Sequence, residues 1–333
     1  MAATALLAPP NPNPHRPAPE RIASIDDVTK LAPELDKQYL TVQPASFATG
    51  NFSDVFPGTW APPEHPEGID VAVKVLRIPG QVNDPGSTDL VARLGKHVGR
   101  EVFVWQMVKH PRITPFIGYI RKYKDGIIPC IVTERRAQGN LATYLSKNPH
   151  VNRFRLLYQA LEGLIYLHTF PGKPITHFDI KPENILITDD GAAELCDFGY
   201  AKAIGEPSGF TTGRNPGGTY PYMSPEVLNG EEWEDLTCAA DVFAMGSTIL
   251  FILSGQLAWY YIKSKVGLIR AVSDGRPADR DQYSLDGSPE AINRLWELLG
   301  RCWSVEPSDR PSSQEVLDEL RSIEAMGGIR PRM

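Results

Sequence analysis

A carboxylate, a lysine and an asparagine stand close together near the middle of the chain, in the segment His177-Phe-Asp-Ile-Lys-Pro-Glu-Asn184. Thirteen residues after Asn184 comes a second carboxylate, Asp197, followed by Phe198 and Gly199. A carboxylate can accept the proton of a hydroxyl group, and carboxylate and amide oxygens are hard ligands suited to Mg²⁺. These residue types are those needed for proton transfer next to a metal-bound anion, although neither motif is specific by itself.

Two further charged residues precede this segment. Lys74 lies in the β-rich run Val71-Ala-Val-Lys-Val-Leu76, and Glu101 follows 27 residues later in a helical pattern. Taken alone, a lysine on a strand is usually an edge or solvent-exposed residue. Upstream, Ala48-Thr-Gly-Asn-Phe-Ser-Asp-Val55 has the form of a degraded glycine-rich loop, and a hairpin turn is the better interpretation of it in isolation. The chemistry therefore depends on the order of the motifs.

Two kinds of pattern would position these residues. Short β-rich runs extend from about residue 39 to 132, with one helix at about 89–109, and helical periodicity dominates after residue 140. The clearest helical segments lie at about 154–165, 291–303 and 313–323, the last with a capping-box pattern. The predicted fold class is therefore α+β: a small β-rich lobe and a larger helical lobe, with a cleft between them.

Further landmarks continue in the same order, with Ser224-Pro-Glu226, then Asp241 before an uncharged run, and Arg310-Pro311. Eight ordered landmarks over residues 40–325 make the sequence resemble the eukaryotic protein kinases. Arg100-Glu-Val102 and the segment from Cys302 to Pro311 are similar to the tyrosine-kinase-like branch common in fungal genomes.

The resemblance implies a bilobal protein kinase fold, with an N-lobe at about 40–135 and a C-lobe at about 136–325. It implies ATP and Mg²⁺ as cofactors. Lys74 would hold the α- and β-phosphates with Glu101 as its partner, because phosphoryl transfer depends on positioning and charge neutralisation. Asp179 would orient the substrate hydroxyl, and Lys181 would reach the γ-phosphate. The implied Mg²⁺ ligands are Asn184 and Asp197.

The base of ATP would lie beside the strand that joins the lobes. Thr133 would be the gatekeeper, and the carbonyl of Glu134 and the amide of Arg136 would face the base. Main-chain contacts do not depend on the side chain, so an arginine at position 136 is compatible with this role. The other residues implied to contact the nucleotide are Gly50, Val55, Ala72 and Leu186.

Three structural features are implied as well. Glu226 and Arg310 would form a buried ion pair, and Asp241 would anchor the backbone of the loop that carries Asp179. Four rings would form an apolar stack that links the lobes, namely Trp105, Phe116, His177 and Phe198.

Three positions depart from the family pattern. Ala48 and Ser53 stand where the phosphate loop usually has its first and third glycines, and Phe178 replaces the arginine before the catalytic aspartate. These departures support a rival hypothesis, a pseudokinase that binds nucleotide or acts as a scaffold. Lys74, Glu101 and the other charged residues of the pattern support an active enzyme instead.

Serine and threonine are the expected acceptors, and dual specificity stays open as an alternative because the C-terminal motifs are similar to the tyrosine-kinase-like branch. Lys181 follows Asp179 at +2, as in Ser/Thr kinases, and Thr219 would narrow the site against a tyrosine. The expected partners are therefore protein substrates with Ser or Thr acceptors, while regulatory partners stay unidentified.

Composition excludes several other classes of protein. Hydrophobic residues make up 42% of the 333 residues and the formal net charge is −6, which gives no electrostatic footprint for nucleic acid. Four scattered cysteines predict reduced thiols, as in a cytoplasmic protein. Residues 1–24 are rich in proline and predict a disordered tail, not a secretory signal. The uncharged run 242–262 is long enough for a membrane span, but the resemblance makes it the buried central helix of the C-lobe.

Overall fold

A computed structural model describes residues 32–49, 53–77, 98–99, 101–123, 128–203, 220–230 and 235–331, with backbone only at 122–123, 128–129 and 202–203. The predicted tail at 1–24, the first part of the helix predicted at 89–109, Gly50 and Thr219 lie outside the described residues.

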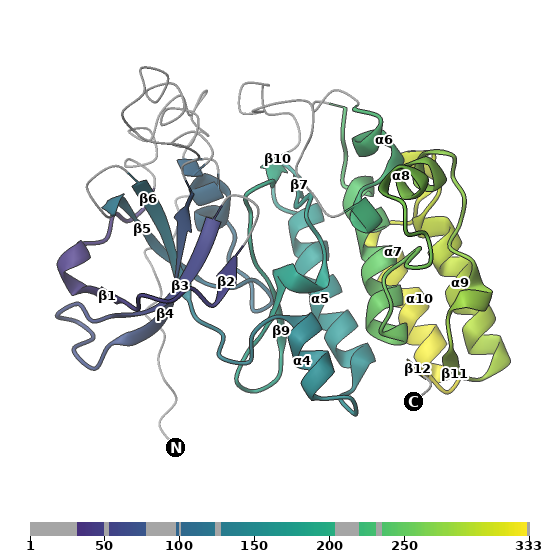
Figure 1. Cartoon of the computed structure of the whole chain (residues 1–333), viewed down its shortest axis with the longest axis horizontal. Coiled ribbons are helices and arrows are strands. Elements are labelled where there is room, and N and C mark those ends of the chain that lie inside the picture. The colour runs from purple at the N-terminus through teal and green to yellow at the C-terminus, as the bar shows by residue number, and fades with distance from the viewer. Residues whose placement is uncertain are drawn as a thin grey trace.

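An antiparallel sheet of six strands forms the smaller lobe (Figure 1), in the order β1-β3-β4-β6-β5 with β2 paired to β3. Its long strands are rich in valine and isoleucine, which favour extended backbone. Side chains alternate across a strand, so Val71, Val73 and Val75 form a small core cluster on one face, and Ala72 and Lys74 point to the other. The strands are β1 (Leu40–Val42), β2 (Ala48–Thr49), β3 (Ser53–Trp60), β4 (Ile69–Leu76), β5 (Phe116–Tyr123) and β6 (Ile128–Glu134).

Helices fill the larger lobe, and β7, β9 and β10 lie between them and the sheet (Figure 1). The α-helices are α4 (Leu141–Lys147), α5 (Arg153–His168), α6 (Pro225–Leu228), α7 (Ala239–Ser254), α8 (Lys265–Ser273), α9 (Pro289–Cys302) and α10 (Ser313–Ala325). The short ladders pair β7 (Ile175–Thr176) with β10 (Lys202–Ala203), β8 (Ile185–Ile187) with β9 (Ala193–Leu195), and β11 (Leu285–Gly287) with β12 (Ile329–Pro331). The 3₁₀ turns are η1 (Lys37–Tyr39), η2 (Pro182–Asn184), η3 (Tyr220–Tyr222), η4 (Arg280–Gln282) and η5 (Pro307–Asp309).

The three helices predicted from periodicity are confirmed as α5, α9 and α10. In α9, Ala291, Leu295 and Leu298 are fully buried, as their helical spacing requires. The capping box of α10 is also confirmed, since Ser312 and Glu315 bond to each other's backbone N–H groups.

The uncharged run 242–262 is not one continuous helix. Its first part belongs to α7, which is buried on almost every side, but α7 ends at Ser254. Gly255 follows in the left-handed region at φ 78° and closes the helix. Within the described residues, no helix is long and apolar enough to cross a membrane.

One hydrophobic core extends from the helical residues 101–107 of the smaller lobe to α10 of the larger lobe. Val102 and Tyr119 belong to it in the smaller lobe, and Leu195 and Leu320 belong to it in the larger lobe. The apolar packing therefore fixes the helix of Glu101 against the segment that carries Asp197.

Candidate active site

Lys74 contacts two carboxylates that are far from it in the sequence. Its Nζ lies 2.7 Å from Oε1 of Glu101 and 2.7 Å from Oδ1 of Asp197. Glu101 is fully buried, while the side chain of Asp197, two residues after β9, is 36% exposed. The fold thus joins a strand, a helix and a loop at one ammonium group.

The pKa values of the two carboxylates differ because their surroundings differ. Burial raises the pKa of Glu101 to about 7, against the attraction of Lys74. Burial acts in the same direction on Asp197, but the ammonium of Lys74 outweighs it and lowers the pKa of Asp197 to about 2. Burial alone would lower the pKa of Lys74, but the two carboxylates raise it. At neutral pH, Asp197 is therefore an ionised carboxylate beside a stable cation.

The side chains of Asp179, Lys181 and Asn184 lie together in the helical lobe. Nζ of Lys181 lies 2.9 Å and 2.7 Å from the two carboxylate oxygens of Asp179. The amide Nδ2 of Asn184 donates to Oδ2 of Asp179 at 2.6 Å and to its main-chain oxygen at 2.8 Å. The ion pair between Lys181 and Asp179 was not part of the sequence-based prediction. It shows that Lys181 also balances the charge of Asp179.

Asp241 holds the backbone that presents Asp179. Its carboxylate oxygens accept hydrogen bonds from the main-chain N–H groups of His177 and Phe178, each at 2.7 Å. Phe178 has a φ of 61°, a left-handed conformation that side chains rarely adopt. Such a residue costs about 1–3 kcal/mol and persists only where its surroundings fix it. The predicted anchoring role of Asp241, which is fully buried at the start of α7, is confirmed.

The predicted stack of four rings is confirmed. Trp105 lies 6.3 Å from Phe116 and 5.2 Å from Phe198, and Phe198 lies 5.1 Å from His177, between ring centroids. Nε2 of His177 also lies 3.0 Å from the main-chain oxygen of Cys196, directly before Asp197. The stack therefore ties the segment of Asp197 to the loop of Asp179.

The strand register places the predicted nucleotide contacts on one face of the sheet. Val55 lies opposite Lys74, and Ala72 lies opposite Thr133. Directly opposite residues point to the same side of a sheet, and Ala72 and Lys74 share a face because they are two residues apart. Leu186, on β8, packs against the main core from the other lobe.

Asn184 and Asp197 fit the chemistry of Mg²⁺. Nδ2 of Asn184 is used by Asp179, which leaves its amide oxygen for a cation, and Asp197 is ionised. Within the described residues no group of three or more His, Cys, Asp or Glu side chains could hold a metal by itself. Two protein oxygens suffice for Mg²⁺ when substrate phosphates and water supply the rest.

One ion pair next to the predicted base-binding segment was missed. The side chain of Arg136 forms a bidentate pair with Glu194 on β9, at 2.8 Å and 2.9 Å. The sequence predicts a role for the main-chain amide of Arg136 only. The one signal in the sequence was an acidic residue inside the apolar strand pattern Ala192-Ala-Glu-Leu-Cys196, and it does not name its partner.

The sequence of this chain is similar to those of known proteins over most of its length. A family model described as "protein kinase domain" matches residues 48–320 of this chain. Serine/threonine-protein kinase STY17 of Arabidopsis thaliana is 29% identical over 294 residues, which are 87% of this chain and 45% of that protein. Receptor-interacting serine/threonine-protein kinase 3 of Rattus norvegicus is 30% identical over 265 residues, 77% of this chain and 51% of that protein. The chain thus spans about half the length of these curated relatives. Since the matched region includes every charged residue of the cleft described above, the chain belongs to the protein kinase family.

Proposed function

We propose that this chain transfers the γ-phosphoryl group of Mg-ATP to serine and threonine hydroxyls of protein substrates. The observation that supports this most is the position of Lys74 between Glu101 and Asp197, at 2.7 Å from each. Charges taken out of water are costly unless they are well paired. A cation held this way, next to an ionised and partly exposed carboxylate, is suited to phosphate groups and their metal.

Asp179 would act on the substrate hydroxyl. Its carboxylate orients the hydroxyl and accepts the proton as the oxygen attacks the γ-phosphorus. The bond from the γ-phosphorus to the oxygen of the β-phosphate breaks, and ADP leaves with that electron pair. Lys181, 2.7 Å from Asp179, can balance charge on both the carboxylate and the transferred group. Mg²⁺, held by Asn184 and Asp197, would neutralise phosphate charge.

Serine and threonine are favoured over tyrosine by Lys181 at +2 and by the names of the relatives, which are serine/threonine-protein kinases. The proposed partners are thus proteins with Ser or Thr acceptors. The cytoplasmic location remains a prediction from the sequence.

A pseudokinase is the second candidate. Phe178 stands before Asp179, and Ala48, on β2, replaces a glycine of the phosphate loop. A methyl group on the loop restricts the backbone that would approach phosphate. A weaker hold on ATP, without loss of transfer, is the effect we expect.

The test is transfer of labelled phosphate from ATP with Mg²⁺ to a generic basic protein, with Asp197→Ala as the matched inactive variant. We expect incorporation by the wild type, mainly on serine and threonine in phosphoamino-acid analysis, and none by the variant. Equal background with both proteins would favour the pseudokinase, and mainly phosphotyrosine would contradict the acceptor assignment.

A further inference from the structure

The guanidinium of Arg136 bonds to two carboxylates at once. Nε and Nη2 donate to the two oxygens of Glu194 at 2.8 Å and 2.9 Å, and Nη1 donates to Oε1 of Glu134 at 2.6 Å. The side chains of Arg136 and Glu194 are only 13% and 8% exposed. Bidentate bonds of this kind fix distance and orientation together. Arg136 therefore ties the segment after β6 to a strand of the other lobe.

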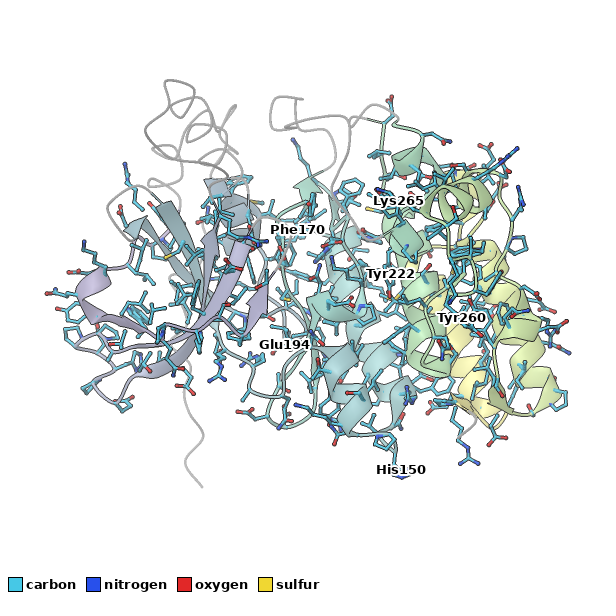
Figure 2. The ribbon with its side chains drawn as sticks, viewed as in Figure 1. His150, Phe170, Glu194, Tyr222, Tyr260 and Lys265 are labelled. Carbon is cyan, nitrogen blue, oxygen red and sulfur yellow. The ribbon has the colours of Figure 1, made fainter. Side chains whose placement is uncertain are left out.

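Glu194 is well placed to serve as the anchor. It lies on β9 opposite Leu186 of β8, and Figure 2 shows it where the sheet lobe meets the helical lobe. The next residue on β9, Leu195, is held by main-chain hydrogen bonds to Arg112 and Thr114 at 2.8 Å and 2.9 Å. The anchor strand is thus fixed independently of Arg136.

The tether acts on the backbone that would contact the base of ATP. β6 ends at Glu134, and Arg136 lies two residues further along the chain, where its carbonyl accepts the N–H of Gly139 at 3.0 Å. The neighbouring N–H groups of Glu134 and Arg135 already bond to the carbonyls of Pro115 and Asp70, at 3.3 Å and 3.1 Å. The three side-chain bonds of Arg136 hold both residues of the expected base contact to one another and to β9.

We propose that Arg136, through Glu194, is a positioning residue for the base of the nucleotide, an inference that rests on the proposed function. A segment held in its binding geometry before ATP arrives loses less conformational freedom on binding, and binding is correspondingly tighter. Arg136 acts through main-chain groups and does not need to touch the substrate. Loss of the tether should weaken nucleotide binding more than it affects the protein substrate.

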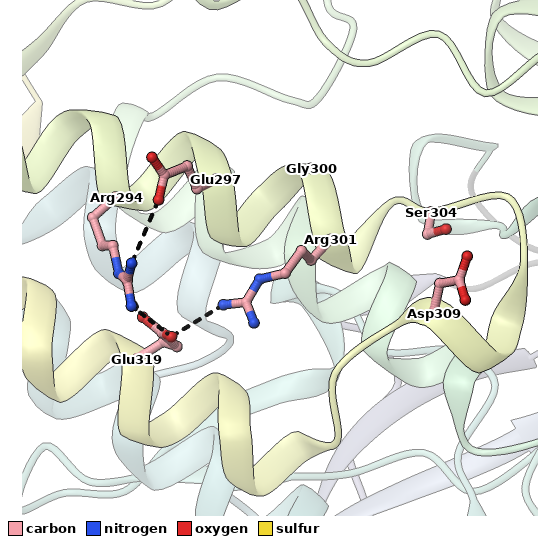
Figure 3. Close-up of a pocket in the computed structure, with 7 residues that line it drawn as sticks. All are labelled: Arg294, Glu297, Gly300, Arg301, Ser304, Asp309 and Glu319. Atoms are coloured by element: carbon pink, nitrogen blue, oxygen red, sulfur yellow. Dashed lines mark hydrogen bonds and ion pairs between the residues drawn. The ribbon is translucent and has the colours of Figure 1, made fainter.

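The variants are Arg136→Ala, Arg136→Lys, Glu194→Gln and the double variant Arg136→Ala with Glu194→Gln. Arg294→Ala is the matched control, because Arg294 forms a bidentate pair with Glu319 at 2.9 Å and 3.0 Å, between α9 and α10 (Figure 3). The measurements on the full chain are the Kd for a non-hydrolysable ATP analogue with Mg²⁺, by calorimetry, and the KM values for ATP and for the protein substrate.

We expect Arg136→Ala and Glu194→Gln each to raise the Kd for the analogue about fivefold to tenfold, a loss of about 1–1.4 kcal/mol of binding free energy. The double variant should bind the analogue no more weakly than Arg136→Ala alone, because Arg136→Ala already removes both bonds to Glu194. Arg136→Lys should recover part of the loss, since lysine keeps the charge without the fork. The KM for the protein substrate and the Kd of Arg294→Ala should stay within about twofold of the wild type, well below this effect.

Three results would overturn the inference. One is an unchanged Kd in Glu194→Gln and Arg136→Lys, the conservative variants that decide the matter if Arg136→Ala does not fold. Another is an equal rise in the KM values for ATP and for protein, which would indicate general loosening of the lobes. A wild-type chain that binds no nucleotide would overturn the proposed function together with this inference, whereas tight wild-type binding with unaffected variants would remove the inference alone.

Discussion

Charged side chains pair at similar distances in two regions of the molecule, inside the helical lobe and around Lys74. The two regions differ in how many of their polar groups are bonded within the protein. Arg310 donates from Nη1 and Nη2 to the two carboxylate oxygens of Glu226, each at 2.7 Å. Its remaining donors bond to the carbonyls of Ala239, Val305 and Ser304 at 3.0 Å, 3.2 Å and 2.9 Å. A guanidinium has five N–H donors, so every one is used by the protein.

The charged groups around Lys74 and Lys181 are not all paired in this way. The ammonium group of Lys74 bonds to the carboxylates of Glu101 and Asp197, and that of Lys181 bonds to the carboxylate of Asp179. Carboxylates therefore outnumber cations here. Oε2 of Glu101 is buried without a hydrogen-bond partner in the described part of the chain.

We call the Glu226–Arg310 pair, in which every donor is used, the complete site. The group around Lys74 and Lys181, in which carboxylates outnumber cations, is the incomplete site.

The largest expected effect is on the complete site. Arg310→Ala should lower the free energy of unfolding by about 3–5 kcal/mol, because it leaves the buried carboxylate of Glu226 without its partner. Urea denaturation followed by tryptophan fluorescence measures this change. A loss below about 1 kcal/mol, typical of an exposed pair, would show that Glu226 finds another partner or water.

The next effect is on the incomplete site and should appear in rate instead of stability. Asp179→Asn removes the carboxylate that orients the hydroxyl, so kcat should fall at least about 100-fold, equivalent to about 2.7 kcal/mol in the barrier. The urea midpoint should be close to that of the wild type, and nucleotide should still bind. Near wild-type turnover would mean that the loop from His177 to Asn184 has been assigned wrongly.

The pairings of the charged residues were unequally predictable from sequence, and the predicted ion pair of Glu226 with Arg310 is confirmed. Lys74, Glu101 and Asp197 could be grouped because each lies in a motif whose order is itself informative. Arg136 and Glu194 could not be paired, because 58 positions separate them and neither motif nor periodicity links one to the other.

The uncharged run 242–262 shows a limit of another kind. Hydrophobic composition indicated burial correctly but did not mark the end of the helix. A single left-handed residue, Gly255, ends α7, and buried Trp259 lies beyond it in the turns that follow. Composition reports the environment of a segment, while local backbone geometry decides where its helix stops.

A smaller effect is expected at the edge of the incomplete site. The double variant Ala48→Gly with Ser53→Gly should lower the KM for ATP about twofold to fivefold, since the freedom of a glycine is worth roughly 0.5–1 kcal/mol. Ser53 is buried on β3 opposite Leu76, whereas Ala48 is exposed on β2. Ala48→Gly alone is therefore the control that leaves the packing of β3 unchanged. An unaltered KM in both variants would remove the two positions from the account of ATP binding.

The smallest effect is expected where the bidentate geometry recurs without burial. The side chain of Arg294 is 46% exposed, and its partner Glu319 also lies 3.2 Å from Arg301 (Figure 3). Water can solvate either charge after the pair is broken, and Arg301 keeps Glu319 partly neutralised, so Arg294→Ala should lower the free energy of unfolding by only about 0.2–0.5 kcal/mol. Urea denaturation at low and at about 0.5 M salt measures this, and the difference from wild type should shrink at high salt because exposed charges are screened. A loss as large as that of Arg310→Ala would mean that bidentate geometry, and not burial with full use of the donors, determines how much such a pair stabilises this fold.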